Sequence, residues 1–151
     1  MSQTSVQVSR TKGLYYTLSH LWVRIGDDLT SEIGLSKYAC RLLTELAKSS
    51  FLLFYPDPIE HVGVKVRIGQ RLGLIETKSS AAFPVISPLT GVVTGINVEA
   101  LDRAYAICEK LESVWLVKIK PTNLDEEALT LLTPEQYERV CEALKMPVDS
   151  I

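Results

Sequence analysis

The chain has 151 residues, of which 46% are hydrophobic and 23% charged, and its 16 basic and 18 acidic residues give a net charge of −2. This length and composition predict one globular domain that buries a core. No segment concentrates Lys and Arg, which disfavours nucleic acid as a partner, and no apolar run approaches the roughly 20 residues that span a bilayer. We therefore expect a cytoplasmic protein without a membrane segment.

The first part of the chain predicts short strands after a mobile start. Residues 1–13 are largely polar, and we expect this N-terminal segment to be mobile. Residues 14–25 are rich in aromatic and β-branched side chains, which favours one or two strands. Residues 29–33 predict a further strand, which we expect to end at Gly34.

A helix and a dense strand follow. Ser36 is placed to cap a helix from Lys37 to about Ser49, because apolar residues recur there at positions i, i+3, i+4 and i+7. Residues 51–55 are all apolar or aromatic and predict a strand, which Pro56 and the residues after it should end.

The centre of the chain, residues 64–96, predicts a hairpin. Val64, Val66 and Ile68 alternate with two basic residues, the period-two pattern of a strand with one buried face, until Gly69 breaks it. A second apolar run at residues 72–75 is interrupted by five polar residues, which cannot lie in a core and so predict an exposed turn. Apolar residues then resume between residues 85 and 96. The five turn residues are Glu76, Thr77, Lys78, Ser79 and Ser80.

Beyond the hairpin the sequence predicts a helix, a strand and two short helices. A helical stripe covers residues 101–111, and residues 114–120 alternate as a strand. Asn123 with Glu126, and Thr133 with Gln136, have the spacing of a capping box.

The last predicted helix presents one apolar face. We expect that face to dock on the domain. Pro134 suits the first turn of this helix, and Met146 with Pro147 should end the helix and leave a tail over residues 146–151. The face consists of Tyr137, Val140, Cys141 and Leu144.

The three cysteines predict no metal or redox chemistry. Cys40, Cys108 and Cys141 are odd in number, widely separated and surrounded by apolar residues, which is typical of reduced core residues. A zinc site, or a nucleophile paired with His20 or His61, would need clustered ligands or a paired base.

Several stretches in order resemble the H protein of the glycine cleavage system, over residues 14 to 141. Each fragment alone is weak evidence for the family, whereas their shared order over nearly the whole chain is specific evidence for it. The fragments are Tyr16-Thr17-Leu18-Ser19-His20-Leu21-Trp22-Val23-Arg24; Gly34-x3-Tyr38-Ala39; Val66-x2-Gly69-x3-Gly73-x2-Glu76; Ser87-Pro88-Leu89-Thr90-Gly91; and Trp115-Leu116-Val117-Lys118-Ile119-Lys120.

The resemblance implies a mainly β fold with small flanking helices, a lipoyl-type barrel-sandwich hybrid forming a single domain over residues 14–145. It also implies a carrier without catalytic residues of its own, on which lipoate is amide-linked to a lysine of the hairpin turn. Lys78 is the only lysine in that turn, and Ser19 and His20 are expected near the arm. The dithiolane of the arm can accept two electrons and open to two thiols, one of which carries a group between enzymes. The implied partners are a lipoate-attaching enzyme and the enzymes of a multienzyme pathway.

The sequence departs from the family in three places. Lys78 lies two residues after Glu76 and ten before Pro88, whereas the family lysine lies three after and eight before, which makes Ser79 or Ser80 its positional equivalent. The family's glutamate before the tryptophan is Leu21 here, and a cationic cargo without a counter-charge gains little from a buried cleft. About eight residues are inserted around residues 47–55; we interpret them as a longer packed strand rather than a partner surface.

Three functions follow as hypotheses. The first is a lipoyl carrier whose cargo is not the aminomethyl group of glycine cleavage, for example in sulfur metabolism. The second is an unmodified interaction module with the same fold. The third is an ordinary glycine cleavage H protein.

Overall fold

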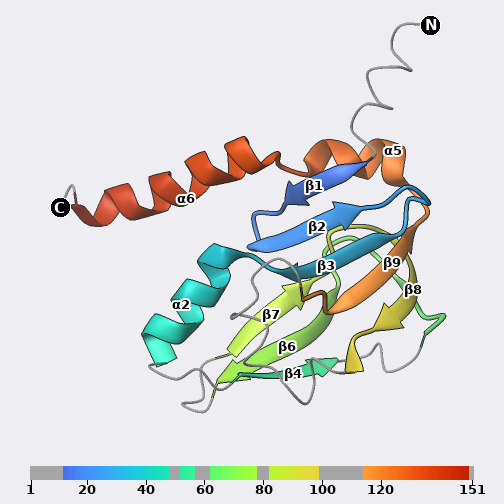
Figure 1. Cartoon of the computed structure of the whole chain (residues 1–151), viewed down its shortest axis with the longest axis horizontal. Coiled ribbons are helices and arrows are strands. Elements are labelled where there is room, and N and C mark those ends of the chain that lie inside the picture. The colour runs from blue at the N-terminus through green and yellow to red at the C-terminus, as the bar shows by residue number, and fades with distance from the viewer. Residues whose placement is uncertain (1–11, 48–51, 57–61, 78–81, 99–113, 150–151) are drawn as a thin grey trace, which may run out of the picture.

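The fold is built from two antiparallel sheets with helices at one side (Figure 1). The structure is a computed structural model of the whole chain, and it describes residues 12–47, 52–56, 62–77, 82–98 and 114–149. Within these ranges one sheet has six strands in the order β1-β2-β3-β9-β8-β5. Their bounds are β1 Gly13–Tyr16, β2 Leu21–Ile25, β3 Ser31–Leu35, β9 Val117–Pro121, β8 Gly91–Ile96 and β5 Lys65–Val66.

The second sheet of the described chain has three strands, in the order β4-β6-β7. Strand β4, Leu52–Pro56, pairs along β6, Arg71–Thr77, and β6 pairs on its other side with β7, Ala82–Ile86. The strand predicted around the insertion is therefore confirmed, and it adds a third strand to the hairpin.

Two longer helices flank the sheets. Helix α2, Lys37–Ala47, begins where Ser36 Oγ accepts a hydrogen bond from the Ala39 N–H at 3.1 Å, as the sequence predicts. Helix α6, Pro134–Asp149, begins with the capping box of Thr133 and Gln136, whose two reciprocal bonds measure 2.9 and 3.2 Å. Between β9 and α6 lie α5, Leu124–Glu127, and the 3₁₀ turn η1, Ala128–Thr130.

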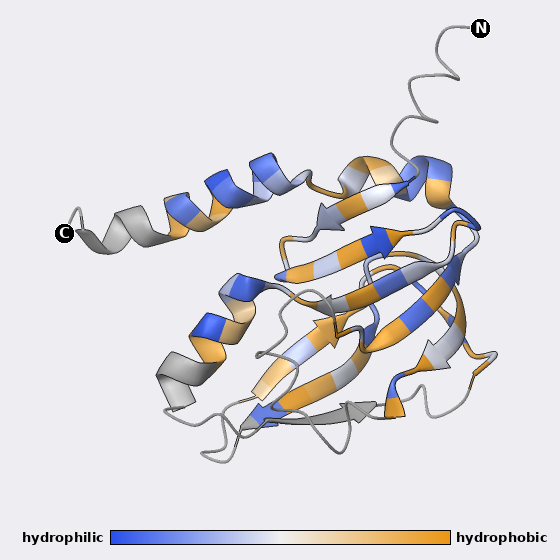
Figure 2. Cartoon of the chain, viewed as in Figure 1, coloured by the Kyte–Doolittle hydropathy of each residue, from blue (hydrophilic) through white to orange (hydrophobic). Residues whose placement is uncertain are grey.

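The main core lies between the two sheets. Hydrophobic residues alternate with polar ones along the strands, most clearly on β9 (Figure 2). Side chains from both sheets meet in one buried cluster, and a smaller cluster lies beneath α5 and η1. The larger cluster includes Leu21, Ile33, Leu35, Val66, Leu72, Ile75, Val85, Val93, Leu116, Val117 and Ile119.

The predicted strand over residues 64–68 is wrong beyond its first part. Only Lys65–Val66 form β5, and the Ile68 side chain is 42% exposed. The chain turns here because the Gln70 N–H donates to the Arg67 carbonyl at 2.9 Å and Gly69 adopts a φ of +89°, a conformation that favours glycine.

The strand predicted to end at Gly34 begins two residues later and runs through it, as β3. Leu29 lies in a turn instead, with a φ of +67°. Gly34 is accommodated inside the strand because the Trp22 indole fills the space where a Cβ would lie, 2.5 Å from the nearest ring atoms. The glycine marks a close packing contact rather than a strand end.

Two predictions about helix ends are wrong. Asn123 makes no side-chain cap to α5, and its amide instead donates to Glu126 Oε2 at 3.4 Å. Helix α6 continues past Met146 and Pro147 to Asp149, so most of the predicted tail is helical. The fixed φ of a proline is compatible with a helix, and its missing N–H and the crowding of its ring disturb only the last turn here, since the helix ends two residues after Pro147. The helix predicted over residues 101–111 lies outside the described residues.

Candidate functional site

The candidate carrier site lies at the end of the β6–β7 hairpin. Glu76 pairs with Ala82 across the hairpin, and Thr77 pairs with Leu52 of β4. Glu76 and Thr77 are therefore strand residues, which corrects their assignment to the turn. Lys78, Ser79 and Ser80 lie outside the described residues, within the 78–81 connection between the two strands. The register fixes where that connection leaves and re-enters the sheet.

The β1–β2 turn holds the two residues predicted to lie near the arm. Thr17 organises this turn: its carbonyl accepts from the His20 N–H at 3.0 Å, and its Oγ1 accepts from the Ser19 and Leu21 N–H groups at 3.2 and 3.3 Å. His20 has a φ of +66°, so the turn holds its backbone in the left-handed region. Leu18 at the tip is 70% exposed.

His20 connects this turn to both long helices. Its Nδ1 lies 2.8 Å from the Tyr137 hydroxyl, which in turn lies 2.7 Å from Ser36 Oγ. The His20 backbone carbonyl accepts from the Ser36 N–H at 3.1 Å, and the imidazole lies 4.8 Å from the Tyr38 ring centroid. These contacts fix the start of α6 and the start of α2 against one turn.

Burial sets the protonation states in this network. Burial lowers the pKa of His20, so the neutral imidazole is favoured, and burial raises the pKa of Tyr137, so its phenol stays protonated. A neutral His20 that accepts from Tyr137 leaves the phenol oxygen to accept from the Ser36 hydroxyl. The Tyr137 hydroxyl is then hydrogen-bonded on both sides, which makes this a positioning network rather than a source of free acid or base.

Sequence reasoning missed this network. Tyr137 was predicted as one member of an apolar stripe, and Ser36 only as a helix cap. Nothing in the local sequence signals the network, because the hydroxyl of Tyr137 meets residues 117 and 101 positions away in the chain.

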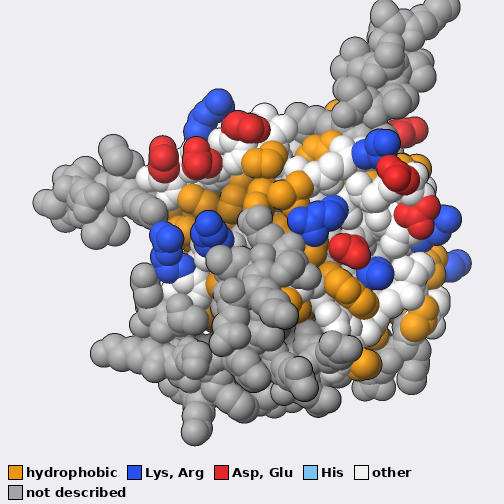
Figure 3. Space-filling model, viewed as in Figure 1, with side chains coloured by type: hydrophobic (Ala, Val, Ile, Leu, Met, Phe, Trp, Pro, Cys, Tyr) orange, Lys and Arg blue, Asp and Glu red, His pale blue; other side chains and the backbone are white. Residues whose placement is uncertain are grey.

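An open groove of about 380 Å³ lies between the two helices. Figure 3 shows an apolar band on this face, with acidic side chains on the α6 side and basic side chains on the α2 side. The groove is lined by Tyr16, Lys37, Tyr38, Arg41, Pro134, Tyr137, Glu138, Cys141 and Glu142.

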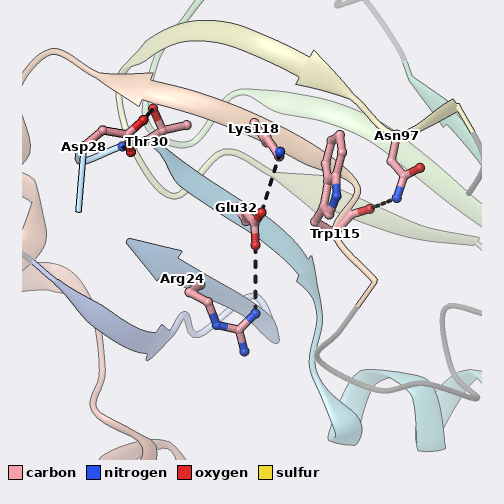
Figure 4. Close-up of polar contacts among 7 residues, drawn as sticks. All are labelled: Arg24, Asp28, Thr30, Glu32, Asn97, Trp115 and Lys118. Carbon is pink, nitrogen blue, oxygen red and sulfur yellow. Dashed lines mark hydrogen bonds and ion pairs between the residues drawn. The ribbon is translucent and has the colours of Figure 1, made fainter. Parts of the chain in front are cut away.

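Two carboxylates of the sheet region already have partners. Glu32 on β3 lies between Arg24 and Lys118, 3.9 and 3.7 Å from their nitrogens (Figure 4). Glu127 accepts from the Thr90 N–H at 2.7 Å and from its hydroxyl at 2.6 Å. Neither is poised to neutralise a cationic cargo.

The position that holds a glutamate in the family is occupied by Leu21 and is not accessible to a cargo. Leu21 is fully buried in the main core, so neither its side chain nor a replacement there would line an exposed cleft without repacking. Cys40 is likewise buried in the core, as predicted; Cys141 is half-buried beside Tyr137, and Cys108 lies outside the described residues.

The fold and site define the class of protein: a lipoyl-type barrel-sandwich hybrid, with two open sheets around one core and a lysine-bearing connection at the end of a hairpin. A family model described as glycine cleavage H-protein matches residues 14–144. The chain belongs to that family, whose members are carriers without catalytic activity of their own.

Relatives and a solved structure agree with this assignment. The probable glycine cleavage system H protein of Pyrococcus abyssi is 33% identical over 133 residues, which cover 88% of this chain and 92% of the relative. That of Nitrosospira multiformis is 32% identical over 130 residues, covering 86% and 93%. The crystal structure of the glycine cleavage system H protein from Mycobacterium marinum matches with a TM-score of 0.65 and 25% identity, covering 82% of this chain and 92% of that one. Among the described residues, no helix is long and apolar enough to cross a membrane.

Proposed function

We propose that this chain is a lipoyl carrier of the glycine cleavage H type, with lipoate amide-linked to Lys78. The observation that carries the proposal is the family match over residues 14–144, taken with the hairpin register. Between Thr77 and Ala82 the sequence offers one lysine, one or two positions before the family's lipoyl-lysine position, so Lys78 is the candidate in this connection.

The chemistry asks little of the protein itself. Amide formation removes the ammonium charge of Lys78 and adds a long arm that ends in a dithiolane. Two electrons open that disulfide to two thiols, and one thiol carries the group between partner enzymes. The partners are a lipoate-attaching enzyme and the enzymes that load and unload the arm. A cytoplasmic location stays a prediction.

Intact-mass spectrometry tests the attachment after co-expression with a lipoate-attaching enzyme. We expect one lipoyl mass on the wild-type chain and none on Lys78→Ala. The matched control is Lys65→Arg on β5, which changes another exposed lysine and should keep the added mass. A Lys78→Ala chain that keeps the added mass would refute the assignment of Lys78.

The shifted lysine gives a second, finer test. If the attaching enzyme reads the lysine position relative to the hairpin strands, Lys78→Ala combined with Ser79→Lys should regain the modification, because Ser79 is a positional equivalent of the family lysine. A faster rate of modification than in the wild-type chain would show that the native register is suboptimal. If the double variant stays unmodified, the attaching enzyme requires the lysine at position 78 of this chain.

Two cargoes are supported by different observations. The relatives are named as glycine cleavage H proteins, which favours the aminomethyl group. The replacement of the family's glutamate by the buried Leu21 is the reason for keeping a cargo without positive charge, such as a sulfur-based group, as the second candidate.

Loading by glycine decarboxylase separates the two. The lipoylated chain is incubated with glycine and glycine decarboxylase, beside the lipoylated H protein of Nitrosospira multiformis as a positive control, and the mass gain of each is measured. Aminomethyl loading of this chain at a rate comparable to the control establishes the glycine cleavage role. A loaded control beside an unloaded chain rules out the ordinary glycine cleavage role. An unmodified mass in native extracts, with a stable co-purifying enzyme, would support the unmodified interaction module instead.

A further inference from the structure

The groove between α2 and α6 has walls of opposite charge. Lys37 and Arg41, one helical turn apart and both exposed, form the α2 wall. Glu138 and Glu142, also one turn apart and exposed, form the α6 wall. Figure 3 shows the apolar band that separates the acidic and basic side chains on this face.

The floor of the groove is preformed and apolar. The rings of Tyr16 and Tyr137 stack with centroids 4.5 Å apart and an angle of 1° between their planes. Cys141 and Tyr38 are half-buried beside them. The apolar face of α6 then continues outward to Leu144, which is 46% exposed, so only the first part of this face docks on the domain as the sequence predicted. A rigid floor lowers the entropic cost of covering it.

We propose that this groove is the interface with a second copy of the chain, in a symmetric dimer. A two-fold axis that runs along the groove places α6 of each copy over α2 of the other. The glutamates of one copy then face Lys37 and Arg41 of the other, and the same contacts occur twice by symmetry. The floor residues and Leu144 become buried between four helices.

Charge complementarity is the reason for choosing a second copy as the occupant. The groove is complementary to itself in only one of the two simple orientations, because an axis across the groove would place acid over acid and base over base. This self-complementarity belongs to the chain alone and does not depend on lipoylation, on cargo or on partner enzymes. The dimer can therefore be tested separately from the proposed function.

Sedimentation equilibrium of the full chain tests the dimer between about 5 and 500 μM. In low salt we expect the average mass to rise from the 16.8 kDa monomer toward twice that value, and to fall again in 1 M NaCl because salt screens the pairs. An exposed ion pair contributes a factor of about 1.4 to 5 in an equilibrium constant. Reversing one wall, as K37E with R41E or as E138K with E142K, changes four pairs from attractive to repulsive and should weaken dimerisation at least tenfold.

Mixing the two reversed variants distinguishes the proposed contact from loss of structure. One variant carries acid on both walls and the other carries base on both, so an equimolar mixture should recover the dimer. The matched control is D125K with E126K on α5, outside the groove, which changes the net charge by the same amount as E138K with E142K. We expect this control on its own to dimerise as strongly as the wild type. Mixed with the K37E, R41E double variant, it should give no mixed dimer.

Two results would overturn the proposal. One is a wild-type chain that stays monomeric at 500 μM in low salt, which would leave the groove to a different protein. The other is a mixture of the two reversed variants that stays monomeric although circular dichroism shows both to be folded.

Discussion

Replacing Tyr137 by phenylalanine removes one oxygen atom and leaves the ring that stacks on Tyr16. That oxygen lies 2.8 Å from His20 Nδ1 and 2.7 Å from Ser36 Oγ. The substitution therefore isolates the hydrogen-bonding part of the contact that fixes α6 to the domain. The loss of packing should be small, because the ring keeps its place.

The magnitude follows from the groups left behind. Ser36 is fully buried and keeps only its bond from the Ala39 N–H, and His20 loses its one described side-chain hydrogen bond. Leaving a buried polar group without its partner costs about 1–3 kcal/mol. We expect Tyr137→Phe to lower the free energy of unfolding by about 1–3 kcal/mol.

Urea denaturation at pH 7.5 measures the change, with Tyr38→Phe as the matched control. Tyr38 is half-exposed and contributes its ring to His20, so removing its hydroxyl should change the free energy of unfolding by less than about 0.5 kcal/mol. Equal effects of the two substitutions would refute the argument that the Tyr137 hydroxyl holds the network together.

Three further changes test the description of the fold. Because burial lowers the pKa of His20 below its ordinary value of 6.5, the unfolded chain binds that proton more readily, and the free energy of unfolding should fall as the pH falls below about 6.5. Urea titrations between pH 7.5 and 5 should show a weaker fall in His20→Gln, and an unchanged slope in that variant would argue against the role of His20. Gly34→Ala would place a Cβ 2.5 Å from ring atoms of the buried Trp22 and should lower the free energy of unfolding, measured by urea denaturation, by at least about 1–3 kcal/mol. A neutral effect would show that the indole can move. Glu127→Ala removes the acceptor of two Thr90 bonds of 2.7 and 2.6 Å and should cost about 1–3 kcal/mol in the same assay, whereas Glu126→Ala, which is exposed beside it, should be nearly neutral.

Features that depend on near neighbours were predictable from the sequence. The Ser36 cap and the Thr133–Gln136 capping box each involve residues three positions apart, and both are confirmed. The period-two alternation predicted for β9 holds over its strand residues, where Val117 and Ile119 are buried. The family was also recognisable, because its fragments occur in one order along the chain.

The same local patterns failed where another part of the chain competes. Ile68 continues a strand alternation, but the turn at Gly69 and a bond from its N–H to Thr90 Oγ1, at 3.0 Å, take it out of the sheet. Gly34 resembles a strand end, yet it lies inside β3 because Trp22 of the adjacent strand fills its side-chain space. In each case the deciding atom belongs to a residue that the local pattern does not contain.

The sequence by itself determined the class of fold and a central hairpin with one candidate lysine, since these rest on periodicity, turn chemistry and the order of motifs. The hairpin is shorter than the predicted residues 64–96, because β5 and β8 pair with each other in the larger sheet and only β6 and β7 form the hairpin. Only the tertiary structure decided that Glu76 and Thr77 are paired strand residues, that Leu21 is buried, and that Tyr137 joins two helices to one turn. Side chains more than a hundred residues apart meet only once the sheets have formed, and a linear pattern records neither their distance nor the charge that faces them.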